Sequence, residues 1–279
     1  MFDPPAPESI PDSLHAYAAY LEERDGEADF QRRTLALRER DTARFEAAPS
    51  CWDGPFDAAL FQRQLRRYDT GAPTSPEMQL LLCMVKINSN EAYGVERVRD
   101  RAAEQDGALG WIHRVVLLEE TYHTRLLLSA ARLFGVTVAE PAPPVLVTRA
   151  LVHAIASMPE GVARPVTLAG EAIGIATFLR LIGAVRRVFA DRPELRDALE
   201  ERVTEVLVDE VGHMSFNRLI ATPGTFVALR GLLAAVAFGT RGAAPEAEAL
   251  GILPVPVREA WDVDPGNLPA EVRRRAFVA

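Results

Sequence analysis

Apolar residues recur along most of the chain at the three- and four-residue spacing of an amphipathic helix, and no segment shows the alternation of a half-buried strand. This pattern predicts an all-α fold. Long helices are expected over about residues 13–47, 75–104, 109–135, 166–190, 194–220 and 225–240, with a short crossover helix over 145–157. Residues 49–76 are predicted to be a connection that includes at most one short helix. The last forty residues contain five prolines and are predicted to form an extended arm.

Two pairs of the predicted helices are joined by short segments of turn-forming residues. Gln105-Asp106-Gly107 separates the first pair, and Asp191-Arg192-Pro193 separates the second. Helices joined in this way form antiparallel hairpins. No linker rich in Gly, Ser or Pro divides the chain into two apolar cores, so we expect a single helical domain over residues 1–279.

Composition excludes several classes of protein. Hydrophobic residues make up 48% of the 279 positions, which is too many for a disordered chain. The 39 acidic residues outnumber the 31 basic ones, for a net charge of −8, and this disfavours a nucleic-acid-binding protein. The charged stretch between about residues 22 and 41 is expected to be a solvated helix face.

The chain shows no sign of an exported or membrane-bound protein. Cys51 and Cys83 are isolated, so neither a zinc ribbon nor a disulfide framework is expected. The N-terminus is acidic and proline-rich, unlike a secretory signal, and the longest uncharged stretches are shorter than the ~20 residues that span a bilayer. We therefore expect a cytoplasmic protein.

Two histidines each follow a glutamate by three positions, in Glu120-Thr-Tyr-His123 and Glu210-Val-Gly-His213. Residues three apart share one face of a helix, so each motif can direct a carboxylate and an imidazole toward one point. A single motif of this kind is weak support for a metal site. Two such motifs on two different hairpins carry more weight.

The partner helix of each motif contains a glutamate at the matching height. Glu91 and Glu120 lie equally far in sequence from the Gln105–Asp106 junction, and Glu171 and Glu210 lie equally far from the Ala190–Asp191 junction. In an antiparallel hairpin, residues equally far from the turn lie side by side. Each hairpin is thus predicted to place a glutamate opposite a Glu-x-x-His motif.

All four glutamates lie within apolar helical stretches, where ionised carboxylates would repel one another unless cations neutralised them. Two divalent metal ions would provide that charge. Four carboxylates and two imidazoles form an oxygen-rich ligand set that suits iron or manganese better than structural zinc.

With these motifs, residues 75–220 resemble the ferritin-like di-iron carboxylate superfamily. The resemblance implies a four-helix bundle, here with flanking helices and a proline-rich C-terminal arm, that holds two iron ions per chain or a Mn/Fe pair. It implies that Glu120 and Glu210 bridge the two metals. Glu91 and Glu171 would be terminal ligands, and His123 and His213 would supply one imidazole to each metal.

An acidic residue immediately precedes each motif. Glu119 and Asp209 occupy the position where many di-iron oxygenases carry an acid that accepts the free N–H of a ligand histidine. We expect the pairing to be crosswise, with Glu119 bonded to His213 and Asp209 bonded to His123.

The resemblance implies an oxidoreductase that activates dioxygen to oxidise a small organic molecule, with electrons from a donor such as a ferredoxin or flavin reductase. The alternative is a ferroxidase or peroxide-consuming protein without an organic substrate; a radical-generating Mn/Fe protein and a metal-free helical interaction protein are further hypotheses. Arylamine N-oxygenases carry a third histidine where this chain has Val206, so the outcome (hydroxylation, N-oxidation or desaturation) stays open. A homodimer is plausible.

Three glycines beside the motifs, Gly170, Gly174 and Gly212, predict either open space or close helix contact, since Gly costs ~1 kcal/mol in a helix. His113, two turns before Glu120, is either a hydrogen-bonded histidine or part of a substrate channel. Six apolar residues are expected to be core or to line a pocket beside the site. They are Met84, Ile87, Leu117, Phe178, Leu207 and Met214.

Overall fold

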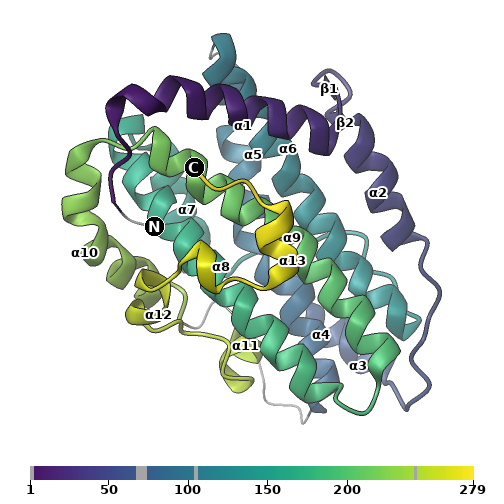
Figure 1. Cartoon of the computed structure of the whole chain (residues 1–279). Coiled ribbons are helices and arrows are strands. Elements are labelled where there is room, and N and C mark those ends of the chain that lie inside the picture. The colour runs from purple at the N-terminus through teal and green to yellow at the C-terminus, as the bar shows by residue number, and fades with distance from the viewer. Residues whose placement is uncertain (1–2, 67–73, 104–105, 242–243) are drawn as a thin grey trace.

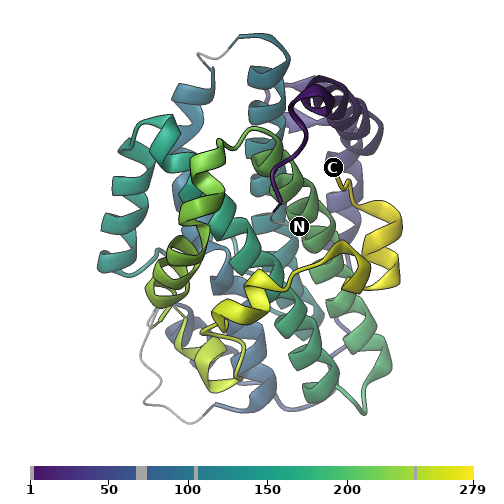
Figure 2. The same cartoon turned by 60° about the vertical axis from the view of Figure 1, so that its left-hand side comes forward.

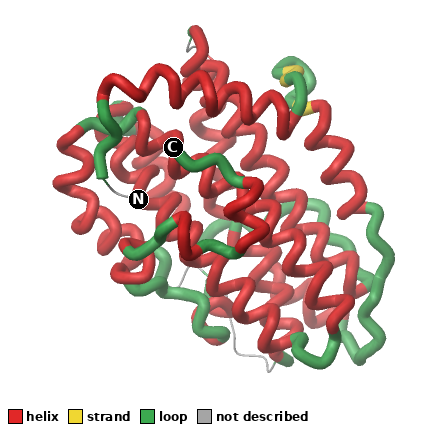
Figure 3. Tube along the Cα trace, viewed as in Figure 1, coloured by secondary structure: helices red, strands yellow, loops and turns green. Residues whose placement is uncertain are grey.

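The computed structural model describes residues 3–66, 74–103, 106–241 and 244–279, and most of these residues are helical (Figure 3). The prediction of an all-α fold is confirmed. Within the described residues, the strands are the two-residue pair β1 (Ala28–Asp29) and β2 (Thr34–Leu35), which run antiparallel. This small hairpin was not predicted from the sequence.

Five helices form the centre of the molecule (Figure 1). They are α4 (Pro76–Ile87), α5 (Ser89–Ala103), α6 (Gly107–Ser129), α8 (Glu160–Val188) and α9 (Pro193–Leu219). α8 packs along α9 and α5 packs along α6, as the two predicted hairpins require, and α6 also packs on α9. The apolar core lies between these helices and includes Val206, Leu207 and Val211, which are fully buried.

Local sequence explains where these helices begin and break. The Ser75 hydroxyl accepts a hydrogen bond from the Met78 amide at the start of α4, and Pro193 occupies the first turn of α9. Gly107, with φ of +75°, is at the first predicted turn; Glu104 and Gln105 lie outside the described residues. The predicted helix over 75–104 is interrupted at Asn88, whose side-chain amide donates to Thr124 Oγ1 at 3.0 Å.

The predicted N-terminal helix over 13–47 is wrong as a single element. The chain forms α1 (Ile10–Asp25), the β1–β2 hairpin and α2 (Ala36–Glu46). The break follows from Gly26, whose φ is +81° and where an added Cβ would lie 2.9 Å from Leu37. α1 and α2 both pack on α6, and α1 also packs on α9.

The helices predicted for the crossover and for the segment after residue 222 are both present, on the outside of the bundle. They are α7 (Leu146–Ser157) and α10 (Pro223–Gly239). α7 packs on α5, and α10 packs on α8. α7 and α10 also lie next to each other (Figure 2). An added Cβ on Gly239 of α10 would lie 3.5 Å from Leu151 Cδ2 of α7. α3 (Ala58–Leu65) is the short helix allowed for in the connection.

The C-terminal segment is not the extended arm expected from its prolines. It forms α11 (Pro245–Ala249), α12 (Val257–Trp261) and α13 (Ala270–Arg275), and short 3₁₀ turns lie at Pro7–Ser9, Ala130–Phe134 and Pro265–Asn267. Ala247, Ile252 and Val272 are fully buried, so the prolines begin short helices that cover the central bundle.

One described helix, Gly161–Val188 within α8, is long and apolar enough to cross a membrane by length and composition. Of its most apolar window, 67% is buried inside the fold, and core helices meet the same criterion. The cytoplasmic location stays a prediction.

Candidate metal centre

Five of the six residues singled out from the motifs form two overlapping groups in the middle of the bundle. Potential ligand atoms of Glu120, His123 and Glu210 lie within 4.8 Å of one another, and so do those of Glu171, Glu210 and His213. Glu210 belongs to both groups. Glu120 also reaches the second group, since its Oε1 lies 3.0 Å from His213 Nδ1.

Glu91 is outside both groups but faces the same space. Burial, and then the negative charges of Glu210, Glu120 and Glu171, raise the pKa of Glu91 well above its usual value. Its Oε2 is buried and has no hydrogen-bond partner among the described residues. α5 therefore brings the fourth predicted carboxylate to the cluster, with one oxygen directed at no donor.

The two imidazoles use their ring nitrogens in the same way. Nδ1 of His123 lies 3.2 Å from Glu120 Oε2 and 3.3 Å from Glu210 Oε1. Nε2 of His123 lies 2.9 Å from Asp209 Oδ2, and Nε2 of His213 lies 2.9 Å from Glu119 Oε2. Both crosswise contacts expected from the sequence are thus present.

Asp209 pairs with two arginines from the N-terminal segment. Arg24 Nε donates to Asp209 Oδ1 at 2.8 Å, and Arg38 forms an ion pair with Asp209 Oδ2. Because both oxygens of this carboxyl group face arginine donors, we assign the hydrogen of the contact to His123 Nε2. In a neutral ring, Nδ1 then presents its lone pair to the glutamates.

Burial and mutual repulsion prevent all of the carboxylates from ionising together. Burial, followed by repulsion from Glu210, raises the pKa of Glu171 well above its usual value, and burial and Glu120 raise that of Glu210 to about 7. Burial disfavours a charged His213, but the carboxylates of Glu119 and Glu120 outweigh it and raise the pKa of His213. Without bound cations, the cluster must hold protons instead.

The cluster fits a pair of divalent metal ions. Glu91 Oε2, Glu210 Oε1 and His213 Nδ1 are buried and without hydrogen-bond partners among the described residues, and Glu210 and His213 belong to the groups of ligand-type atoms given above. Bound cations would satisfy all three and would replace the protons that the acids otherwise retain. Oxygen donors dominate the set, which suits iron or manganese.

Several residues around the cluster were missed by the sequence analysis. Arg24, Asp25 and Arg38 were assigned to a solvated face, yet Asp25 is fully buried and Arg38 is 5% exposed. Charge content alone does not show that a residue pairs with a buried acid. Asn217 donates to Glu171 Oε1 at 3.2 Å, and its position four residues after His213, on the same helix face, was a usable signal.

The three glycines beside the motifs have different roles. An added Cβ on Gly212 would lie 3.3 Å from the Tyr17 ring, so this glycine allows close helix contact. At Gly174 the nearest atom would be Glu210 Oε2 at 3.7 Å, and at Gly170 nothing lies within 4 Å. Gly170 therefore borders open space.

Three cavities reach the carboxylates. The first, which we call the inner cavity, has a volume of about 380 Å³ and is bordered by Val98, His113 and Phe216. The second, which we call the α7–α10 cleft, has a volume of about 280 Å³ and lies between α7, α8 and α10. Leu117 lines the inner cavity, and Ile87 and Phe178 line a third cavity of about 180 Å³ that includes Glu91. Met84, Leu207 and Met214 are fully buried core residues, and His113 packs edge-on against Phe216.

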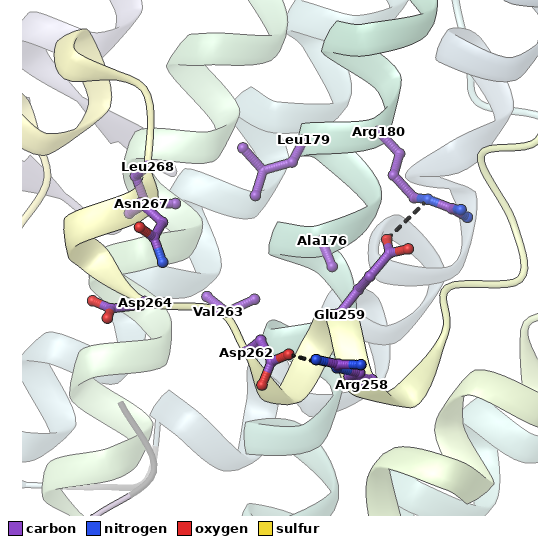
Figure 4. Close-up of a pocket in the computed structure, with 10 residues that line it drawn as sticks. All are labelled: Ala176, Leu179, Arg180, Arg258, Glu259, Asp262, Val263, Asp264, Asn267 and Leu268. Atoms are coloured by element: carbon purple, nitrogen blue, oxygen red, sulfur yellow. Dashed lines mark hydrogen bonds and ion pairs between the residues drawn. The ribbon is translucent and has the colours of Figure 1, made fainter.

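A further cavity, of about 390 Å³, lies between α8 and the C-terminal segment (Figure 4). Its charged side chains largely pair with each other. Arg180 Nε lies 3.1 Å from Glu259 Oε2, and Arg258 Nε lies 3.3 Å from Asp262 Oδ2. None of the cluster residues lines this cavity.

No family model matches the chain, and neither a curated protein nor a solved structure was found to match it.

Proposed function

We propose that the chain is a ferritin-like di-iron carboxylate protein and that it is an oxygenase or oxidase acting on a small organic molecule. The observation that carries this proposal is the convergence of three carboxylates and two crosswise-bonded histidines from α6, α8 and α9, with Glu91 of α5 lining the same cavities. This arrangement is the one found in di-iron bundle proteins. Two bound iron ions, or an Mn/Fe pair, would supply dioxygen reduction there.

The chain's own residues prepare the site for this chemistry. Glu120 and Glu210, which approach both histidines, would be shared between the two metals, and Glu91 and Glu171 would each be a ligand of one metal. Asp209 and Glu119 orient the imidazoles, and apolar side chains of the bundle core surround them.

The adjoining cavities favour an organic substrate over a ferroxidase. The inner cavity and the α7–α10 cleft both border Glu91, Glu120 and Glu171, which leaves room beside the cluster for a small molecule. A monooxygenase outcome would transfer one oxygen atom to the substrate and release the other as water. Its two electrons would come from an external donor of the ferredoxin or flavoprotein class.

The test is the metal content of protein loaded anaerobically with Fe²⁺ and, separately, with Mn²⁺. We expect about two metal ions per wild-type chain and a marked loss in the Glu120→Gln/Glu210→Gln variant. Glu200→Gln is the matched control, because Glu200 is an acid of the same helix, α9, that pairs with Arg186 away from the cluster. A wild-type chain that binds neither metal would contradict the proposal. Iron uptake far beyond two ions per chain would favour the ferroxidase.

A further inference from the structure

The inner cavity and the α7–α10 cleft adjoin each other at the carboxylates. Both are lined by Glu91, Glu120 and Glu171, and both are bordered by Val152 and Ile155 of α7. Their volumes, about 380 and 280 Å³, are those of small-molecule sites. A molecule that filled both would pass directly over the cluster.

The walls of this space are mainly aliphatic. Apart from the three glutamates, the cleft is lined by hydrocarbon side chains such as Leu151 and Val236, by two glycines and by uncharged threonine and asparagine side chains. In the inner cavity, Arg164 and His113 each lie seven residues before a cluster glutamate, about 10 Å along their helices. Among the described residues, the walls next to the carboxylates therefore offer mainly apolar contact, and the one arginine of the inner cavity, Arg164, lies two helical turns away from Glu171 in sequence.

The outer end of the cleft is also apolar. Leu151, which lines it, is 46% exposed. Leu146 on α7 and Phe238 on α10 are 78% and 68% exposed. Both helices that form the cleft thus carry exposed apolar side chains, and Leu151 is the one of these three that lines it.

We propose that the substrate is a mainly aliphatic molecule that enters between α7 and α10 and lies across the carboxylates into the inner cavity. This inference rests on the proposed function, because it takes the cluster as the place of oxidation. The segment over the carboxylates must be uncharged or apolar, since an anion there would be repelled by the glutamates.

Gly170 allows a direct test, because it lines the cleft and an added Cβ there would meet nothing within 4 Å. A leucine at this helical position projects into the space that the substrate would fill. Gly231 on α10 is the matched control, since it also has nothing within 4 Å and lines none of the cavities described above. Gly170→Ala tests the backbone effect alone.

The experiment measures binding of N-phenyl-1-naphthylamine, an uncharged probe that fluoresces in apolar sites, to metal-free protein and its displacement by 1-hexanol, 1-octanol and 1-decanol. We expect the affinity for the alcohols to rise with chain length in the wild type. Gly170→Leu should weaken 1-decanol binding by about ten-fold, because the leucine side chain would occupy space that the hydrocarbon chain of the alcohol fills in the wild type. Gly170→Ala and Gly231→Leu should bind as the wild type does.

Affinity independent of chain length, or equal affinities of wild type and Gly170→Leu, would overturn the inference. The metal content of the same preparations separates this result from the fate of the proposed function. A chain that binds metal but no alcohol contradicts the aliphatic substrate alone. A chain that binds the alcohols in a Gly170-dependent way but never binds metal contradicts the proposed function alone.

Discussion

Each histidine of the cluster has its two ring nitrogens in different surroundings. Nε2 of His123 contacts Asp209, an acid fixed by Arg24 and Arg38, while Nδ1 faces the glutamates. The acid thereby determines both the direction of the ring and the nitrogen that is left without a hydrogen. Asp209 is a positioning residue, because it acts on the cluster through His123.

We expect Asp209→Asn to lower metal affinity by about 10–100-fold, since the amide cannot be held as an anion and accepts the imidazole hydrogen less strongly. Competition titration with a chromophoric chelator measures this change. Glu200→Gln is the control, because Glu200 lies on the same helix and pairs with Arg186 at the surface. Equal affinities for Asp209→Asn and the wild type would contradict the positioning role.

Asp25 predicts a pH effect on stability. Its burial, and then the charge of Glu119, raise the pKa of Asp25 from 3.8 to about 8. The folded state therefore binds a proton that the unfolded state releases between these values, so this contribution to stability is present below about pH 4 and is lost as the pH rises to about 8. Asp25→Asn removes the effect.

Urea unfolding of metal-free wild type and Asp25→Asn across this pH range checks the prediction. The free energy of unfolding of the wild type should fall relative to the variant, by at most about 1.4 kcal/mol per pH unit. A difference between the two that stays constant with pH would show that Asp25 is ionised in the folded chain.

At the scale of elements, the N-terminal helix α1 packs against α9, on the outside of the central bundle. Tyr17 of α1 packs against Gly212 and stacks on Phe216 with ring centroids 5.6 Å apart. The glycine lets α1 approach closely enough for Arg24, at the end of the same helix, to reach Asp209. Close packing at one residue thus supports an ion pair beside the cluster.

Substitution of Gly212 by alanine should destabilise the fold, because its Cβ would lie 3.3 Å from the buried Tyr17 ring. Gly231→Ala has nothing within 4 Å and should stabilise α10 slightly. We expect the free energies of unfolding of the two variants to differ by about 1–3 kcal/mol, measured by chemical denaturation. Equal stabilities would mean that α1 moves away from α9 without cost.

The sequence was most informative where geometry limits the alternatives. In an antiparallel hairpin, equal distance from the turn determines which residues are neighbours, so the pairing of Glu91 with Glu120 follows from their positions in the chain. The break at Gly26 and the burial of Arg38 could not be predicted in this way. Buried and exposed arginines look alike in a sequence, and only the long-range contact with Asp209 distinguishes this one.

For the whole molecule, a buried ion pair joins the C-terminal segment to the bundle. Lys86 of α4 and Glu246 of α11 are 2% and 3% exposed, with Nζ 2.6 Å from Oε1. Although they are 160 residues apart in sequence, each compensates the charge of the other. The proline-rich sequence of this segment gave no indication of such a contact.

Lys86→Met should destabilise the protein by about 3–5 kcal/mol, because it leaves Glu246 buried without its cation. The double variant Lys86→Met/Glu246→Leu should recover most of that loss, since two apolar side chains need no compensation. Denaturant unfolding of the two variants and of the wild type measures both effects. A double variant as unstable as Lys86→Met would show that packing around α11, rather than charge, accounts for the loss.

The crosswise hydrogen bonds also determine how the molecule can be divided. The first hairpin contains His123 but the second contains its acceptor Asp209, and His213 depends in the same way on Glu119. Each half therefore carries a complete Glu-x-x-His motif and lacks the group that orients its histidine. If the chain were cut in the crossover, neither fragment could hold its imidazole in place by itself, and the two would have to reassociate before either motif was fully organised.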